Sequence, residues 1–144
     1  MVVLLVVVSV TALSCEIATK LSIKGGNPPK FYMSGSGLLG RLVIRGHEQQ
    51  RKIEGPDASA YWCIEPKDED SLRNVGRLSP ITYGSIPEGY TQVYPENGQP
   101  PLLVEGQKYY VQVDSVNANG ASGWFIVRNG KAEFSEYEHS LQEN

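Results

Sequence analysis

The segment from residue 103 to residue 122 constrains the fold of this chain more than any other. Leu103, Gly106 and Tyr109 have the spacing of a tyrosine corner, in which a turn carries the chain between sheets and the tyrosine hydroxyl bonds to backbone a few residues upstream. Beyond the corner the residues alternate as in a half-buried strand. One face takes Tyr109, Val111 and Val113, and the other takes Tyr110, Gln112 and Asp114. The segment therefore predicts a β-sandwich.

The same segment resembles the penultimate strand of a fibronectin type III domain, which reads roughly L-x-P-G-x-x-Y-x-V-x-V-x-A-V-N-x-x-G-x-S. Glu105 stands where that family has proline, and Ser115 stands where it has alanine. The resemblance spans residues 103–122 of the 144-residue chain. It implies an immunoglobulin- or fibronectin-like antiparallel sandwich, and it does not imply a ligand.

Length and composition agree with a single all-β domain. A chain of 144 residues is long enough to bury a core without disulfide or metal staples. The 15 glycines and nine prolines lie between short alternating apolar runs, which is typical of a turn-rich antiparallel protein. We expect one β-sandwich of seven to eight strands with no internal repeat.

The alternating runs give the expected strand positions. Besides the strand after the tyrosine corner, they are 17–23, 31–34, 39–45, 59–65, 81–83, 90–94, 124–127 and 131–134. Apolar residues on both faces of 59–65 place that strand near the centre, with Trp62 as the core aromatic. Asn129-Gly130 between the last two runs predicts a tight hairpin.

The N-terminal residues have the character of an export signal. Residues 2–12 are apolar except for Ser9 and Thr11, and this run is too short to span a bilayer. It matches the apolar region of a secretory signal, although the usual basic start is missing. We expect a signal peptide at 1–14, the sandwich at 15–135 and a flexible tail at 136–144, where apolar residues are too few to fold.

The signal ends in Ala12-Leu13-Ser14-Cys15, which resembles the cleavage motif of bacterial lipoproteins. Ser14 fits the motif. The motif prefers leucine three residues before the cysteine and a small residue two before it, whereas this chain has Ala12 and Leu13 at those positions. Such cleavage would leave Cys15 as the lipidated first residue, holding the protein at the outer membrane or cell surface by about 0.8 kcal/mol per buried methylene. The competing cleavage, after Ala12, would leave Cys15 unmodified.

The second cysteine, Cys63, lies in an apolar run, so we expect it to be a small buried hydrophobic residue. Pairing with Cys15 is disfavoured, because one cysteine lies in an N-terminal tail and the other in a core strand.

Charge and residue spacing argue against several functional classes. The net charge of -3 without a basic cluster argues against nucleic-acid binding. His47 and His139 are the two histidines of the sequence, and neither lies in a zinc or catalytic motif. We therefore expect no cofactor, no metal and no enzymatic activity. Asp68-Glu69-Asp70 could supply calcium ligands with Asp57 or Glu65, but a solvated loop explains the same run.

Binding is the remaining class. Tyr83, Tyr90 and Tyr94 surround loops rich in glycine and proline and could form an exposed platform for a glycan or peptide. Aromatic residues are also favoured in strands for packing alone. We expect an exported, lipid-anchored, non-catalytic binding or structural module of the bacterial cell envelope, with an envelope protein or glycan as partner.

Two alternatives differ from this expectation. The first is a carbohydrate-binding module that uses exposed aromatic side chains. The second is a hydrolase with an unrecognised site, which would require His47 to meet a carboxylate and a hydroxyl in a cleft. The sequence does not determine the oligomeric state.

Overall fold

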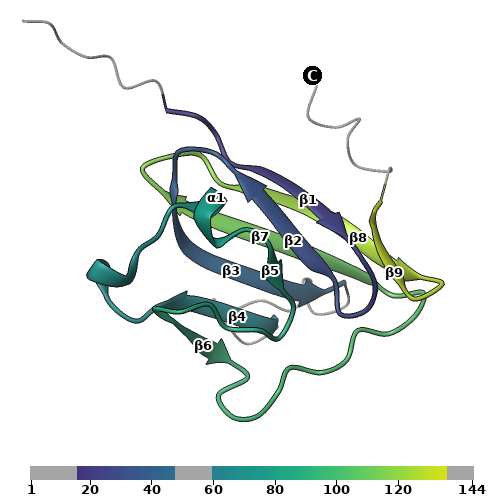
Figure 1. The fold of residues 1–144 in the computed structure, drawn as a ribbon. Helices are drawn as coiled ribbons and strands as arrows, with labels where there is room; N and C mark the ends of the chain where they lie inside the picture. Colours follow the sequence, from purple (N-terminus) through teal and green to yellow (C-terminus); the bar gives the residue numbers. More distant parts are fainter. Residues whose placement is uncertain (1–15, 48–59, 136–144) are drawn as a thin grey trace, which may run out of the picture.

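Short strands with period-two alternation assemble into two antiparallel sheets that face each other as a β-sandwich (Figure 1). The computed structural model describes residues 16–47 and 60–135. The smaller sheet has the order β1-β2-β5, with β1 Lys20–Lys24, β2 Lys30–Ser34 and β5 Ile81–Thr82. The larger sheet has the order β6-β4-β3-β7-β8-β9. Its strands are β3 Leu38–Gly46, β4 Ala60–Pro66, β6 Tyr90–Tyr94, β7 Lys108–Val116, β8 Ala121–Arg128 and β9 Lys131–Phe134.

The core lies between the two sheets and is built from one side of each strand. Phe31 of β2 meets Phe125 of β8 edge to face, with ring centroids 6.0 Å apart. Trp62 of β4 is completely buried, as predicted, and its ring contacts Tyr83 at 5.4 Å. These aromatic contacts across the sandwich favour one packing arrangement over a slipped register.

The predicted tyrosine corner is present at the start of β7. The Val104 backbone N–H donates a hydrogen bond of 2.7 Å to the Tyr109 hydroxyl, which in turn donates to Gln107 Oε1 at 3.2 Å. Gly106 has φ +80°, a left-handed conformation that its lack of a side chain permits. Leu103 and Tyr109 are buried, which confirms that the corner is fixed to the core.

The predicted hairpin between β8 and β9 is joined to this corner. Asn129 and Gly130 both have positive φ, as a type I′ turn requires. The Glu105 carboxylate accepts hydrogen bonds from the backbone N–H groups of both turn residues. Glu105, which stands at the proline position of the fibronectin pattern, therefore ties the corner to the tip of the neighbouring hairpin.

Some predicted boundaries are wrong. The first strand begins at Lys20 rather than at Ile17, whose side chain is 59% exposed, because only the later residues pair with β2. The connection after β4, where a solvated loop was one explanation of the Asp68-Glu69-Asp70 run, contains a 3-10 turn at Glu69–Ser71 and the one-turn helix α1, Val75–Leu78. The described residues form nine strands, one at each of the nine expected positions, although a total of seven or eight was expected.

The predicted signal peptide at 1–14, Cys15 and the predicted tail at 136–144 lie outside the described residues, as do Asp57 and His139. Within 16–47 and 60–135, no helix has the length and apolar character needed to cross a membrane.

Candidate binding face

The three tyrosines predicted to form an exposed platform do not form one. Tyr83 and Tyr90 are only 6% and 2% exposed, respectively, and both belong to the core between the sheets. Tyr94, at the end of β6, is half-buried and packs on the other face of the larger sheet. The platform prediction is therefore wrong, because the loops around β5 and β6 turn two of the rings inward.

Hydrogen bonds explain how the two core tyrosines are accommodated. The Tyr90 hydroxyl donates to the Leu39 carbonyl at 2.8 Å, and the Tyr83 hydroxyl donates to the Pro101 carbonyl at 2.7 Å. Burial raises the pKa of both phenols above the ordinary value. Each ring therefore fastens a loop to the sandwich and is not available to a ligand.

A second apolar cluster lies on the opposite face of the larger sheet. Val43, Ala60 and Cys63 are buried there, with Val93 and Tyr94 packed against them. The expectation that Cys63 is a small buried hydrophobic residue is confirmed, since its exposed fraction is 0%. This cluster covers the β4 and β6 side of that face, so any open binding surface must lie further along the sheet.

The β7–β8 face is the part of this outer surface formed by Tyr110, Gln112, Asp114, Ser122 and Trp124. Strand alternation turns these side chains away from the core, opposite to Tyr109, Val111 and Val113. The register pairs Tyr110 with Trp124 and Gln112 with Ser122, so the residues form adjacent rows across two strands. Ser122 is exposed and the other four are half-exposed.

Three rings meet at one end of the β7–β8 face. The Trp124 indole contacts the Tyr110 ring at 5.0 Å between centroids, with the planes tilted by 54°. The ring of His47, the residue after β3, lies 5.3 Å from the same indole. Neither Tyr110 nor Trp124 belongs to a core cluster. Their ring surfaces are held in place by each other and remain partly open to solvent.

A polar network continues from the rings along the same face. Arg45 Nη1 donates to Gln112 Oε1 at 2.9 Å, and Gln112 Nε2 donates to Asp114 Oδ1 at 2.7 Å. Arg41 Nε lies 3.4 Å from Asp114 Oδ2 and 3.5 Å from Glu65 Oε1. Because Arg41 is paired with Asp114 in the β3–β7 register, the network follows directly from the strand alignment.

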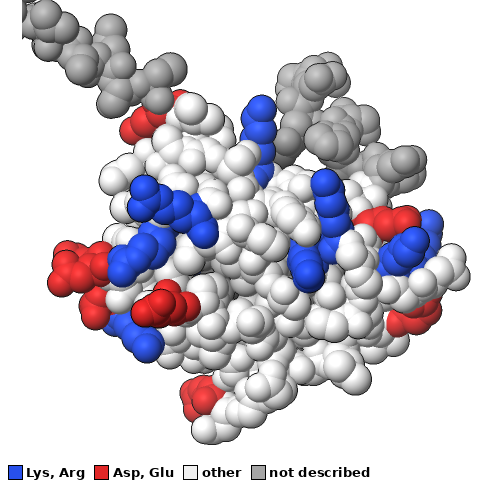
Figure 2. All heavy atoms as spheres, viewed as in Figure 1, with Lys and Arg blue, Asp and Glu red and all other residues white. Residues whose placement is uncertain are grey.

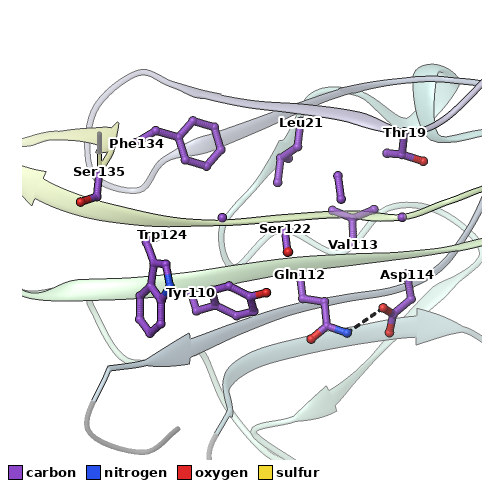
Figure 3. Close-up of a pocket in the computed structure, with 13 residues that line it drawn as sticks. Thr19, Leu21, Tyr110, Gln112, Val113, Asp114, Ser122, Trp124, Phe134 and Ser135 are labelled. Atoms are coloured by element: carbon purple, nitrogen blue, oxygen red, sulfur yellow. Dashed lines mark hydrogen bonds between the residues drawn. The ribbon is translucent and has the colours of Figure 1, made fainter. Parts of the chain in front are cut away.

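Beside this face is a hollow of about 690 Å³ that surrounds the first half of β8. Figure 3 shows Tyr110, Gln112 and Trp124 on one side of the strand and Leu21 and Phe134 on the other. Among the described residues, β9 pairs with β8 only from Phe125 onwards. The Ser135 backbone N–H donates a hydrogen bond to the Trp124 carbonyl, and no described strand pairs with β8 at 121–123 from this side.

Asp68, which was considered as a calcium ligand, has a structural role in the fold. Asp68 Oδ1 accepts hydrogen bonds from Ser71 N at 2.8 Å and Ser71 Oγ at 2.7 Å, so it caps the 3-10 turn. Within the described ranges, no three His, Cys, Asp or Glu side chains come together as a metal site would require. His47, which the hydrolase alternative would use, has its ring 5.3 Å from the Trp124 ring between centroids.

Charge is dispersed over the face of the smaller sheet. Figure 2 looks onto that sheet and shows basic side chains spread between uncharged areas, with acidic side chains close to several of them. No large region of one sign is visible on that face.

The sequence analysis did not single out Trp124 and placed Tyr110 only on the face opposite to Tyr109 and Val111. Trp124 directly precedes the buried Phe125, which is the signal in the sequence that could have placed it on the outer face. The sequence does not reveal the pairing of β7 with β8, which places Tyr110 beside Trp124. The chain matches no protein-family model, no curated protein and no solved structure.

Proposed function

We propose that this chain is an exported, lipid-anchored, non-catalytic binding module of the bacterial cell envelope, with an immunoglobulin- or fibronectin-like sandwich. The single observation that carries the binding role is the paired Tyr110 and Trp124 rings on the β7–β8 face, with a hydrogen-bonded polar network beside them. Half-exposed aromatic rings next to ordered polar groups are typical of recognition surfaces.

The strand arrangement supports the finer fold assignment. β7, which starts at the tyrosine corner, lies between β3 and β8 in one sheet, while β1, β2 and β5 form the other. In the immunoglobulin arrangement, the corner strand likewise lies between the third strand and the final strand. β6 and β9 are additions at the two edges of the larger sheet.

The export and anchoring part rests on the Ala12-Leu13-Ser14-Cys15 motif. β1 begins at Lys20, five residues after Cys15, so lipid on that cysteine would hold the sandwich close to the membrane surface. Cys15→Ser should move the protein from the membrane fraction to the soluble fraction, and the mature parent should carry the mass of its acyl groups. A parent mass without acyl groups, together with unchanged membrane association of the variant, would refute the anchor.

The binding part is tested with envelope fractions. The parent should retain a component of isolated cell envelope, and Trp124→Ala should abolish this retention while circular dichroism shows the fold intact. Tyr32→Ala is the matched control, because Tyr32 is also half-exposed but lies on the smaller sheet beneath Lys24. Equal retention by Trp124→Ala and the parent would refute the assigned face.

A further inference from the structure

We propose that the β7–β8 face is a saccharide-binding site for a neutral glycan, with Trp124 and Tyr110 as the stacking platform and Gln112 and Asp114 as the hydrogen-bonding groups. This inference rests on the proposed binding function and names the chemical class of the ligand. It follows from three properties of the face, namely its rings, its alternating donors and acceptors, and its balanced charge.

The rings supply the apolar contact that a sugar needs. A pyranose presents a patch of C–H groups on one face and hydroxyls around its rim, so it stacks on an aromatic ring while its edge stays polar. Trp124 and Tyr110 hold each other at 5.0 Å between centroids and keep a ring surface open beside the hollow (Figure 3). Rings already held in place lose little conformational freedom when a ligand binds.

The network beside the rings matches a polyol. Gln112 uses its carbonyl oxygen to accept from Arg45 and its amide nitrogen to donate to Asp114, so its orientation is fixed from both ends. A carboxylate oxygen can accept several hydrogen bonds, and Asp114 is only half-buried. The exposed Ser122 hydroxyl lies opposite Gln112 in the β7–β8 register. Donors and acceptors therefore alternate within reach of one sugar edge.

The charges of the network argue for a neutral ligand. Among the described residues of the network, Arg41 and Arg45 supply two positive charges, and Asp114 and Glu65 supply two negative charges. Arg41 lies between both carboxylates, and Arg45 bonds to Gln112, so the guanidinium groups are already engaged. An acidic glycan or a nucleic acid would have to displace these contacts, whereas uncharged hydroxyls can add to them.

The hollow gives a ligand space beside the rings. Its volume of about 690 Å³ includes space on both sides of β8, and the ring pair and the polar groups line one of these sides (Figure 3). Its lining extends from the ring pair past Ser122 to Thr19 and Asp114, so it is elongated along β8 (Figure 3). We therefore assign it a short oligosaccharide segment that runs beside the strand.

The test measures oligosaccharide binding by the full chain carrying Cys15→Ser, using calorimetry and intrinsic tryptophan fluorescence. The probes are neutral cellohexaose, maltohexaose, xylohexaose and chitohexaose, with acidic oligogalacturonate for comparison. At least one neutral probe should bind, and Trp124→Ala should weaken it at least tenfold. Gln112→Ala should weaken the same probe by a smaller factor, while Tyr32→Ala should leave its affinity unchanged.

A blocking variant covers the case in which Trp124→Ala unfolds. Ser122→Arg places a long side chain across the hollow without removing a packed ring, and it should also weaken binding at least tenfold. Preference for oligogalacturonate, absence of binding to every neutral probe, or full affinity in the folded Ser122→Arg and Trp124→Ala variants would overturn the glycan assignment. Retention of an envelope protein through Trp124 in the absence of oligosaccharide binding would overturn it too, while leaving the proposed binding function in place.

Discussion

Removing one hydroxyl from the tyrosine corner should measurably destabilise the sandwich. Tyr109→Phe keeps a completely buried ring, with its contacts to Phe125 at 5.5 Å and Tyr61 at 5.3 Å between centroids. It removes the acceptor of the 2.7 Å hydrogen bond from Val104 N. The variant therefore isolates the corner hydrogen bond from the packing of the ring.

The magnitude follows from what each group loses. A backbone N–H without its acceptor costs about 1 to 3 kcal/mol when water cannot replace the bond. Val104 is 49% exposed, so water can partly replace it. The second bond, to Gln107 Oε1, is longer at 3.2 Å and lies at an exposed residue, so it adds little. We expect a loss of about 1 to 2 kcal/mol in the free energy of unfolding.

The assay is urea denaturation at pH 7 followed by tryptophan fluorescence, with stability taken from the midpoint at an unchanged slope. Tyr110→Phe is the matched control, because it removes the same hydroxyl one residue away on the outer face. The structure gives the Tyr110 hydroxyl no hydrogen bond to another described residue, so its loss should cost less than about 0.5 kcal/mol. Equal losses in the two variants would refute the assignment of the corner.

Three further predictions concern the core and its edges. Gln92→Ala should lower the free energy of unfolding by about 1 to 3 kcal/mol in urea denaturation, because Gln92 Oε1 accepts the hydrogen bond of 3.1 Å from the buried Trp62 indole N–H. A loss below about 0.5 kcal/mol would contradict this role. Gly123→Ala should cost about 1 to 3 kcal/mol, since the new Cβ would lie 2.7 Å from Phe134 Cε1, and an unchanged midpoint would show that the ring moves freely. Burial raises the pKa of Tyr83, so its phenol ionises in the unfolded chain before it does in the folded one. The neutral Tyr83 phenol therefore contributes its full stabilisation below about pH 10. Above that pH the free energy of unfolding should fall by up to about 1.4 kcal/mol per pH unit. Unfolding free energies that stay constant from pH 8 to pH 11 would refute this.

Local sequence patterns determined the strands and the turns that join them. The alternation after Tyr109 correctly divided the side chains of β7 between its two faces, because neighbouring side chains of a strand must point to opposite sides. Asn129-Gly130 predicted its hairpin for a similarly local reason, since both residues tolerate positive φ. Such features depend on a few consecutive residues, so one sequence is enough to locate them.

Only the tertiary structure decided which aromatic residues face solvent. The sequence placed Tyr83 and Tyr90 beside loops, yet distant backbone carbonyls bind their hydroxyls and draw both rings into the core. Tyr110 and Trp124 become a pair because β7 and β8 align in one register, and the described part of β9 pairs with β8 only from Phe125 onwards. Alternation assigns a residue to one of two faces, but the packing of whole sheets determines which face is buried. That is why the strands could be predicted from the sequence, whereas the candidate site could not.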